Sequence, residues 1–460
     1  MQLLLRDIRS FHRPSPALLA PITLLIGENS SGKSTFLAAM RILIEVLYGS
    51  SRPSFNEEPF LLGSFEQIAH AGKGRRGRSK SFQIGVDFNL PRSLGSPEMN
   101  QAKIRELLRE ADQGDEPGGR FEVKFREVDA HPQVDQIELS ALERKITLTV
   151  ADNQSLARIE LNSPNSSMTV LPEDFEEIFP LLRRAPMAFD VEDITRFLEY
   201  RPAATRRQKP SSDIAEYPRE DLMLLRGIAR WLQQHFGGSP YAAAPVRTRP
   251  RRTYDPVKEA QRPEGDHVPM ALARIFATKD PEESAVLEGL NKYGKASGMF
   301  DEILVKHLGK SGSDPFQIKI STSGVSSNLL DVGYGVSQVL PILVDVLQGR
   351  ARQYYLLQQP EVHLHPKSQA ELGSFFVDMA KRNGRHFVIE THSDAIIDRV
   401  RIEVKNGKLP ATSVSLLFFE RTKGESTIHN MSLDQEGNLL NAPSNYRAFF
   451  LEEEKRILGV

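Results

Sequence analysis

The stretch Gly27-Glu-Asn-Ser-Ser-Gly-Lys33-Ser34-Thr35 has the residue types and the spacing that bind a phosphate. Its glycines let the backbone curl so that peptide N–H groups face an anion. Lys33 can reach the β- and γ-phosphates of a nucleotide, and the Ser34 hydroxyl can ligate Mg²⁺. A predicted strand precedes the stretch and a predicted helix follows it, which is the context of a P-loop. The predicted phosphate-binding residues are Asn29, Ser30, Ser31, Gly32, Lys33, Ser34 and Thr35.

A second phosphate-facing turn is predicted at Asp331-Val-Gly333-Tyr-Gly335-Val-Ser337-Gln338, ahead of the amphipathic stretch VLPILVDVL. Two glycines and a serine at a helix start can direct N–H groups and a hydroxyl toward an anion. An ordinary helix cap has the same composition, so this turn gains weight only from the motifs that follow it. Its candidate nucleotide-binding residues are Gly333, Gly335, Ser337 and Gln338.

The stretch LLQQPEVHLHP, residues 356–366, has the apolar run of a buried strand that ends in two amides. Beside a P-loop, such a strand presents one acid to the Mg²⁺ shell, and a second acid orients the attacking water. Gln358 and Gln359 occupy these positions. An amide can form hydrogen bonds, but it accepts no proton and attracts Mg²⁺ less strongly than a carboxylate. We therefore take both as catalytic candidates, and Ser34 and Gln358 as metal candidates.

Three neighbouring side chains are weaker candidates for a catalytic or metal-binding role. Glu361 is close enough in sequence to be a substitute base, but the geometry of the adjacent proline disfavours that role. His363 and His365 would splay apart on a strand, and we interpret them as part of a structural turn.

His392 follows the predicted strand HFVIE in a polar turn with Thr391 and Ser393. A histidine there could contact the γ-phosphate. Because a lone histidine is more often structural, this interpretation depends on the other three motifs.

Periodicity predicts the elements that must position these residues. PITLLIG, YYLLQQ and HFVIE have the apolar runs of buried strands, and Ser34 to Tyr48 has helical spacing. FEVKFREV and RKITLTVA alternate with period two, as antiparallel strands do. A short charged helix is expected near 101–120, and a compact helical insertion interrupted by prolines is expected over 171–240.

Composition narrows the class of protein. The 460 residues are 40% hydrophobic and 26% charged, which is typical of a globular chain. The net charge of −1 provides no global field to attract nucleic acid. The chain contains no cysteine, which excludes disulfides and thiolate chemistry. The apolar runs are shorter than the roughly 20 residues that cross a bilayer, and the N-terminus lacks the layout of a signal peptide. We therefore expect a cytoplasmic protein that does not contact membrane.

GENSSGKST, DVGYGVSQ, LLQQPEVHLHP and ETHSD, in this order, resemble the ABC-type ATPase superfamily in its SMC-like and RecF-like branch. They look most similar to stand-alone ATPases related to the overcoming-lysogenization-defect (OLD) proteins. PVRTRPRRTYDP and GNLLNAPSNYRAFFLEE also resemble a subgroup of bacterial ATPases found in anti-phage defence operons.

The resemblance implies an α/β P-loop fold, an ATPase head with a mixed β-sheet and an inserted β/helical subdomain. Residues 1–95 and 246–460 would form the head, and 96–245 the insertion. Two ATP molecules with Mg²⁺ would be held between the subunits of a homodimer or a higher homo-oligomer. Ser337 and Gly335 of one subunit would cap the γ-phosphate held by Lys33 of the other. Gln358 falls on the family's Mg²⁺-shell acid, Gln359 on its catalytic glutamate, and His392 on its switch histidine.

Gln358 departs from the family pattern, which resembles EEPE or EQPE at this place. We expect Gln358 to impair ATP hydrolysis and not ATP binding, because the phosphate-binding residues are all present. Two explanations stay open: a Glu-to-Gln change introduced to hold the ATP-bound dimer, or a natural ATP-gated clamp that turns over very slowly.

Three functions fit these features. The first is an ATP-dependent switch in anti-phage defence that controls a separate effector protein. The 68 residues that follow His392 lack the acidic cluster of a nuclease domain. The second is a RecF- or SMC-like repair clamp that contacts DNA through basic stretches at 73–80, 204–209 and 246–252. In that last stretch the arginines could instead face ATP or the dimer partner. The third is a nucleotide-bound scaffold without turnover.

Overall fold

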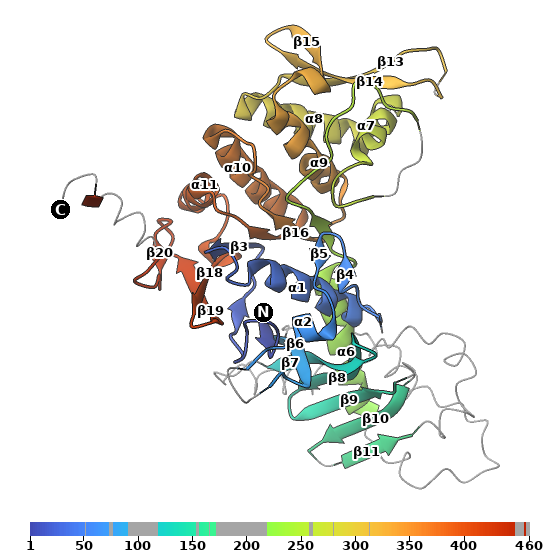
Figure 1. Ribbon diagram of the computed structural model, residues 1–460, viewed down its shortest axis with the longest axis vertical. Coiled ribbons are helices and arrows are strands. Elements are labelled where there is room, and N and C mark those ends of the chain that lie inside the picture. Colours follow the sequence, from blue (N-terminus) through green and yellow to red (C-terminus); the bar gives the residue numbers. More distant parts are fainter. Residues whose placement is uncertain are drawn as a thin grey trace. The chain divides into compact units, whose positions relative to one another are not determined.

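The computed structural model describes residues 1–50, 52–72, 77–90, 118–152, 156–164, 166–171, 219–256, 261–278, 280–311, 313–446 and 455–456. They form two compact units (Figure 1). Unit 1 comprises Met1–Leu19, Asn29–Ser239 and Glu420–Ile428, and unit 2 comprises Ala20–Glu28, Pro240–Phe419 and His429–Val460. Residues 101–117 of the expected charged helix and most of the helical insertion expected at 171–240 lie outside the described residues, and a β-strand begins at Gly119.

An eight-stranded antiparallel sheet forms the body of unit 1. Its order is β11-β10-β9-β8-β7-β6-β1-β2. Side chains of β7 alternate between buried and half-buried, which confirms the period-two prediction for FEVKFREV. The strands are β1 (Gln2–Arg6), β2 (Ala17–Leu18), β6 (Ser81–Phe88), β7 (Gly119–Val128), β8 (His131–Ala141), β9 (Arg144–Val150), β10 (Leu156–Ser163) and β11 (Ser166–Val170).

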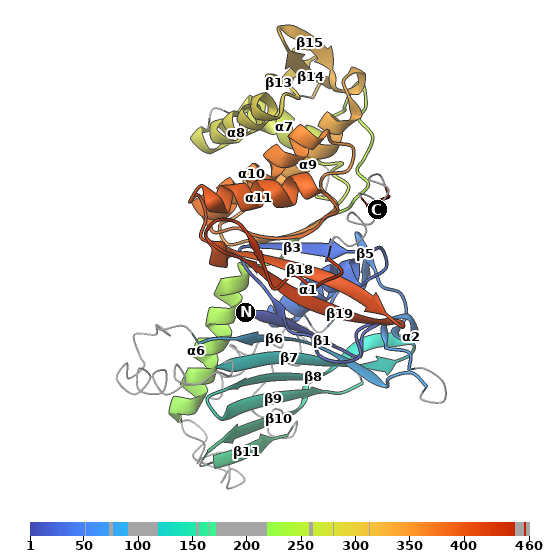
Figure 2. The same ribbon diagram turned by 90° about the vertical axis from the view of Figure 1, so that its left-hand side faces the viewer.

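Helices cover parts of this sheet. Helix α6 (Arg219–Phe236) contacts β8 and β9 (Figure 2), and it confirms the helical prediction for that part of the chain. Helix α1 (Lys33–Leu47) contacts β1, β6 and α6, and nearly all of its side chains are buried. The small elements α2 (Phe65–Ile68), β4 (Asn56–Glu57) and β5 (Phe60–Leu61) complete unit 1.

A seven-stranded mixed sheet organises unit 2, in the order β12-β16-β17-β3-β18-β19-β20. The first five strands run parallel, and β20 is antiparallel to β19. The predicted strands PITLLIG, YYLLQQ and HFVIE are confirmed as the central strands. The bounds are β3 (Ile22–Gly27), β12 (Tyr241–Ala243), β16 (Tyr354–Gln358), β17 (His386–Glu390), β18 (Val414–Thr422), β19 (Glu425–Leu433) and β20 (Leu439–Leu440).

Helices and a three-stranded sheet complete unit 2. The helices and the inward-facing strand residues share one hydrophobic core, which includes Leu24, Leu357 and Ile389. The elements are α7 (Val268–Ala277), α8 (Pro281–Ser297), α9 (Tyr334–Gln348), α10 (Pro366–Asn383), α11 (Asp394–Lys405), β13 (Glu302–His307), β14 (Phe316–Thr322) and β15 (Val325–Asn328), with short 3₁₀ turns at Leu329–Asp331 and Ala411–Ser413.

Asp345 fixes helix α9 to its neighbours. Its carboxylate accepts hydrogen bonds from the Tyr241 hydroxyl at 2.7 Å, from His267 Nε2 at 2.8 Å and from Gln261 Nε2 at 3.3 Å. The carboxylate is buried, so each donor would lose its partner in a dry environment if the side chain were removed. Asp345 thus ties α9 to β12 and to the start of α7.

We predict that Asp345→Ala lowers the free energy of unfolding by about 3 kcal/mol, because it leaves several buried donors without an acceptor. Urea unfolding measures this loss. The control Asp378→Ala removes a more exposed carboxylate that pairs with Lys292, and it should cost less than about 1 kcal/mol. Equal losses in the two variants would contradict the anchoring role of Asp345.

Candidate functional site

The parallel strands of unit 2 end together at one edge of the sheet. Gln358, the last residue of β16, is in register with Glu390, the last residue of β17. Glu390 is in register with Leu25 of β3, and Gly27 is in register with Phe419 of β18. In open α/β sheets, ligands bind outside the carboxyl ends of the strands. The edge therefore brings together two of the sequence motifs and the start of the glycine loop.

The glycine loop leaves this edge at Gly27, which has a φ of 134°. A Cβ atom at Gly27 would lie 2.3 Å from the carbonyl oxygen of Phe419, so only glycine fits the strand end. Glu28, Asn29 and Ser30 are exposed. The loop is thus accessible to a ligand at its most polar part.

In unit 1 the loop leads into α1. Gly32 is the residue before the helix, with a φ of 107°, and it provides no side chain to cap the first-turn N–H groups. The N–H groups and the positive dipole end at the start of a helix attract an anion. Lys33 and Thr35 are buried, while Ser34 is exposed. Ser31 is also buried, so the predicted loop residues differ in their access to a ligand.

Three residues that the sequence analysis missed hold this loop within unit 1. The Arg9 guanidinium donates to Thr35 Oγ1 at 3.2 Å, and that of Arg421 donates to the carbonyl oxygen of Ser30 at 3.1 Å. The ring of Phe11 lies so close to Gly32 that a Cβ atom there would approach it to 2.6 Å. These contacts join segments that are distant in sequence, and no local pattern indicates them.

Gln358 and Gln359 occupy different environments. Gln358 is buried at the strand end, while Gln359 adopts a φ of 42° and donates its backbone N–H to the carbonyl oxygen of Glu390 at 2.8 Å. A left-handed conformation at a non-glycine residue costs about 1 kcal/mol or more, and it persists because surrounding contacts fix it. The turn after β16 is therefore tightly constrained.

Glu390 is a carboxylate that the sequence analysis did not single out. It is buried, and its register with Gln358 places both side chains on the same face of the sheet. The sequence could have indicated Glu390, because it ends the apolar run HFVIE directly before Thr391-His392. A charged residue at the end of a buried strand is unusual. The edge thus carries a carboxylate beside the amide of Gln358.

Hydrogen bonds from backbone N–H groups hold the turn that contains His392. Thr391 donates its N–H to the carbonyl oxygen of Leu25 at 3.1 Å, and His392 donates its N–H to Glu361 Oε1 at 2.8 Å. Ser393 caps α11 by accepting from the N–H of Ile396. The His392 side chain is exposed at this edge.

The turn DVGYGVSQ forms the start of α9. Gly333 precedes the helix, and a Cβ atom at Gly335 would lie 2.8 Å from the carbonyl oxygen of His363. The Ser337 hydroxyl donates to the carbonyl oxygen of Tyr334 at 2.7 Å, and Gln338 is almost fully buried. The helix start therefore packs directly on the turn that follows Glu361.

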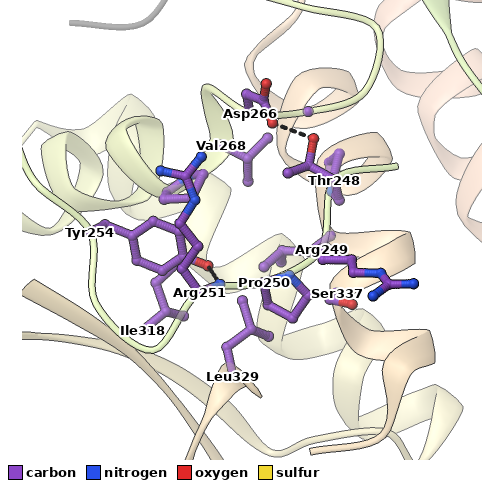
Figure 3. Close-up of a pocket in the computed structure, with 14 residues that line it drawn as sticks. Thr248, Arg249, Pro250, Arg251, Tyr254, Asp266, Val268, Ile318, Leu329 and Ser337 are labelled. Atoms are coloured by element: carbon purple, nitrogen blue, oxygen red, sulfur yellow. Dashed lines mark hydrogen bonds between the residues drawn. The ribbon is translucent and has the colours of Figure 1, made fainter. Parts of the chain in front are cut away.

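The basic segment 246–252 lies against the same helix start. Arg252 forms a bidentate ion pair with Asp331, at 2.6 and 2.9 Å. Arg249 and Arg251 line a hollow together with Ser337 (Figure 3). Arg247 is buried, with only 2% of its surface exposed. The other two basic stretches fall partly (73–80) or wholly (204–209) outside the described residues.

Residues 22–398 match the family described as "AAA domain, putative AbiEii toxin, Type IV TA system". The chain belongs to this AAA-domain family. Membership confirms the ATPase class that the motifs predicted, and the observed sheets confirm the mixed α/β fold.

Several solved structures of SMC heads are similar to the chain. The SMC head bound to the C-winged helix domain of ScpA is 10% identical, covers 94% of this chain and 98% of its own, and has a TM-score of 0.45. The SMC head with an extended coiled coil, bound to the C-terminal domain of ScpA from Pyrococcus furiosus, is 12% identical over 99% and 98%, with a TM-score of 0.41. The SMC head domain from Thermotoga maritima is 12% identical over 93% and 97%, with a TM-score of 0.35. Among curated proteins, none matches the chain.

Two absences apply to the described part of the chain. It contains no helix that is both long and apolar enough to cross a membrane. Nor do its histidine, aspartate and glutamate side chains form a group of three or more that could hold a metal ion on their own.

We predict that Gly32→Ala weakens ATP binding at least about tenfold, because the added Cβ atom meets Phe11 and the left-handed φ strains an alanine. Isothermal titration measures the affinity. The control Gly77→Ala also has a positive φ, of 64°, but no atom lies within 4 Å of its added Cβ. Its ATP affinity should equal that of the wild type, and a matching loss in both variants would argue against a specific effect on the loop.

Proposed function

We propose that the protein is an ATP-binding switch that pairs with a second copy of itself and controls a separate effector protein in anti-phage defence. The glycine loop is the observation that supports ATP binding. It leaves the carboxyl edge of a parallel strand at a residue where only glycine fits, and it ends at an uncapped helix start. In this proposal Asn29, Ser30, Ser31, Gly32, Lys33, Ser34 and Thr35 bind the phosphates.

Mg²⁺ fits the oxygen donors of these motifs. This ion is usually held through one or two carboxylates together with phosphate oxygens, rather than by a cage of protein groups. Ser34 is exposed in the first turn of α1, and Gln358 stands beside the carboxylate of Glu390. Ser34 and Gln358 would hold the ion, Glu390 would provide the negative charge that an amide lacks, and bound Mg²⁺ would neutralise phosphate charge.

Turnover is slow in this proposal because neither amide can accept a proton from water. Gln359 would orient the attacking water through its amide, and His392 would contact the γ-phosphate with its exposed side chain. The protein would therefore spend most of its cycle in the ATP-bound state, which suits a switch better than a motor.

Pairing of two copies would use the start of α9, with exposed Gly333 and half-buried Gly335 facing the nucleotide of the other copy. Ser337 and Gln338 are buried in the single copy, and Ser337 would support the turn through its hydrogen bond to Tyr334. Three large apolar side chains near this turn are exposed, namely Val325 at 66%, Leu330 at 42% and Tyr334 at 40%. Exposed apolar groups beside a polar motif are typical of an interaction surface.

The defence role is supported by the family description, which names a putative toxin of a type IV TA system. A clamp on DNA is the alternative, and SMC ATPases with DNA-stimulated activation are among the similar structures. The basic segment gives this alternative little support, because Arg247 is buried and Arg252 is paired with Asp331. Fewer arginines of that segment are then available for phosphates of DNA.

We predict that Lys33→Ala abolishes measurable ATP binding, because it removes the cation that faces the β- and γ-phosphates. Equilibrium dialysis with labelled ATP measures this. Lys295→Ala, a substitution in the last turn of α8, provides a charge-matched control and should bind ATP normally. Unchanged binding by Lys33→Ala would overturn the proposed nucleotide site.

We also predict that Gln358→Glu raises the rate of phosphate release by at least about tenfold, because a carboxylate both attracts Mg²⁺ and accepts a proton. A continuous phosphate assay measures the rate, and Gln353→Glu, before β16, serves as the control substitution. If Gln358→Glu binds ATP but releases no phosphate, a scaffold without turnover describes the protein better than a slow switch.

A further inference from the structure

Arg247 carries a buried charge that the rest of the described chain does not hydrogen-bond. Only 2% of its surface is exposed, and Nε, Nη1 and Nη2 all lack a hydrogen-bond partner among the described residues. Burial lowers the pKa of Arg247 to about 10, which leaves it charged at neutral pH. A buried guanidinium is costly unless an anion lies close to it.

Two groups oppose the effect of burial on Arg247. Tyr241 and, after it, the Glu361 carboxylate raise the pKa of the arginine, and neither forms a hydrogen bond with it. Arg247 follows β12, and β12 runs parallel to β16, the strand that precedes Glu361. Arg247 and Glu361 therefore lie beyond the carboxyl ends of neighbouring strands.

Glu361 is itself hydrogen-bonded to the turn that contains His392. It is 7% exposed, and its Oε1 accepts the backbone N–H of His392 at 2.8 Å. Its Oε2 has no hydrogen-bond partner among the described residues by geometry, although the Thr391 hydroxyl also acts on the carboxylate. Burial raises the pKa of Glu361, while the N–H of His392 and the charge of Arg247 act in the opposite direction.

We propose that the buried carboxylate of Glu361 positions His392 for the terminal phosphate, and thereby sets how strongly the protein distinguishes ATP from ADP. This inference rests on the proposed function, since it requires a nucleotide at the edge of the sheet. The charge of Arg247 favours the ionised form of Glu361, and a charge-assisted hydrogen bond to the backbone fixes the turn more firmly than a neutral one. Only ATP has the phosphate that His392 would contact, so the loss of this hydrogen bond should affect ATP and leave ADP unaffected.

The segment that carries Arg247 continues to the start of α9. Beyond Arg247 the chain reaches Arg249, which lines the hollow beside Ser337 (Figure 3). Arg252 then pairs with Asp331. A shift of the segment would change both the charge that acts on Glu361 and the contact with the DVGYGVSQ turn. The state of the terminal phosphate and the position of the α9 start are therefore expected to be coupled.

Dissociation constants for ATP and ADP test the proposal, measured by titration in the presence of Mg²⁺ for Glu361→Ala, Arg247→Met and His392→Ala. Each variant should lose about tenfold in its preference for ATP over ADP, with ADP affinity unchanged. The double variant Glu361→Ala with His392→Ala should lose no more than His392→Ala alone, because both changes remove one interaction.

Glu403→Ala is the matched control, since Glu403 is a buried carboxylate in the last turn of α11, away from the strand ends. It should lower thermal stability without changing the preference. Should Glu361→Ala fail to fold, Glu361→Gln keeps the volume and an acceptor oxygen but removes the charge, and the preference should fall about threefold.

The outcomes separate the two proposals. A wild-type preference in the folded Glu361 variants, or an equal loss for ATP and ADP, overturns the positioning role while the nucleotide site stands. If the wild-type chain binds neither nucleotide, the proposed function fails and this inference fails with it.

Discussion

The register of the parallel strands in unit 2 determines which candidate groups meet at one edge of its sheet. Because Gln358, Glu390 and the end of β3 are in register, one edge of the sheet receives an amide, a carboxylate and the start of the glycine loop. A slip of one residue would turn each of these side chains to the opposite face. Leu357 and Ile389 lie in the hydrophobic core, so a slip would also bring a polar side chain into a position that an apolar one now fills.

Charge at this edge is distributed in an unusual way. The two positions directly after the apolar run of β16 are neutral, while Glu361 and Glu390 are both buried nearby in the fold. A buried carboxylate without a partner would be protonated or destabilising. Burial raises the pKa of Glu361, and the N–H of His392 and the charge of Arg247 act in the opposite direction by stabilising the ionised form. The edge is therefore polar and preorganised even though amides occupy the usual acidic positions.

The sequence predicted the strands, the glycine loop and the order of the motifs, because each of these has a local pattern. PITLLIG and HFVIE are apolar runs, and the glycine loop has fixed spacing. Contacts between distant segments were not predictable in this way. Arg9 and Arg421 reach the loop only after folding, and nothing in the basic segment distinguishes buried Arg247 from exposed Arg249. Glu361 was disfavoured as a base from its adjacent proline, and its hydrogen bond to the His392 turn became apparent only in three dimensions.

The close approach at Gly335 has a consequence for how the chain can vary. The backbone there is pressed against the carbonyl oxygen of His363, with no room for even a methyl group. Any larger residue at this position would require the HLHP turn to be rebuilt at the same time. Two motifs that are almost thirty residues apart in the chain are thus expected to be inherited together, as a single steric unit, among proteins that keep this arrangement.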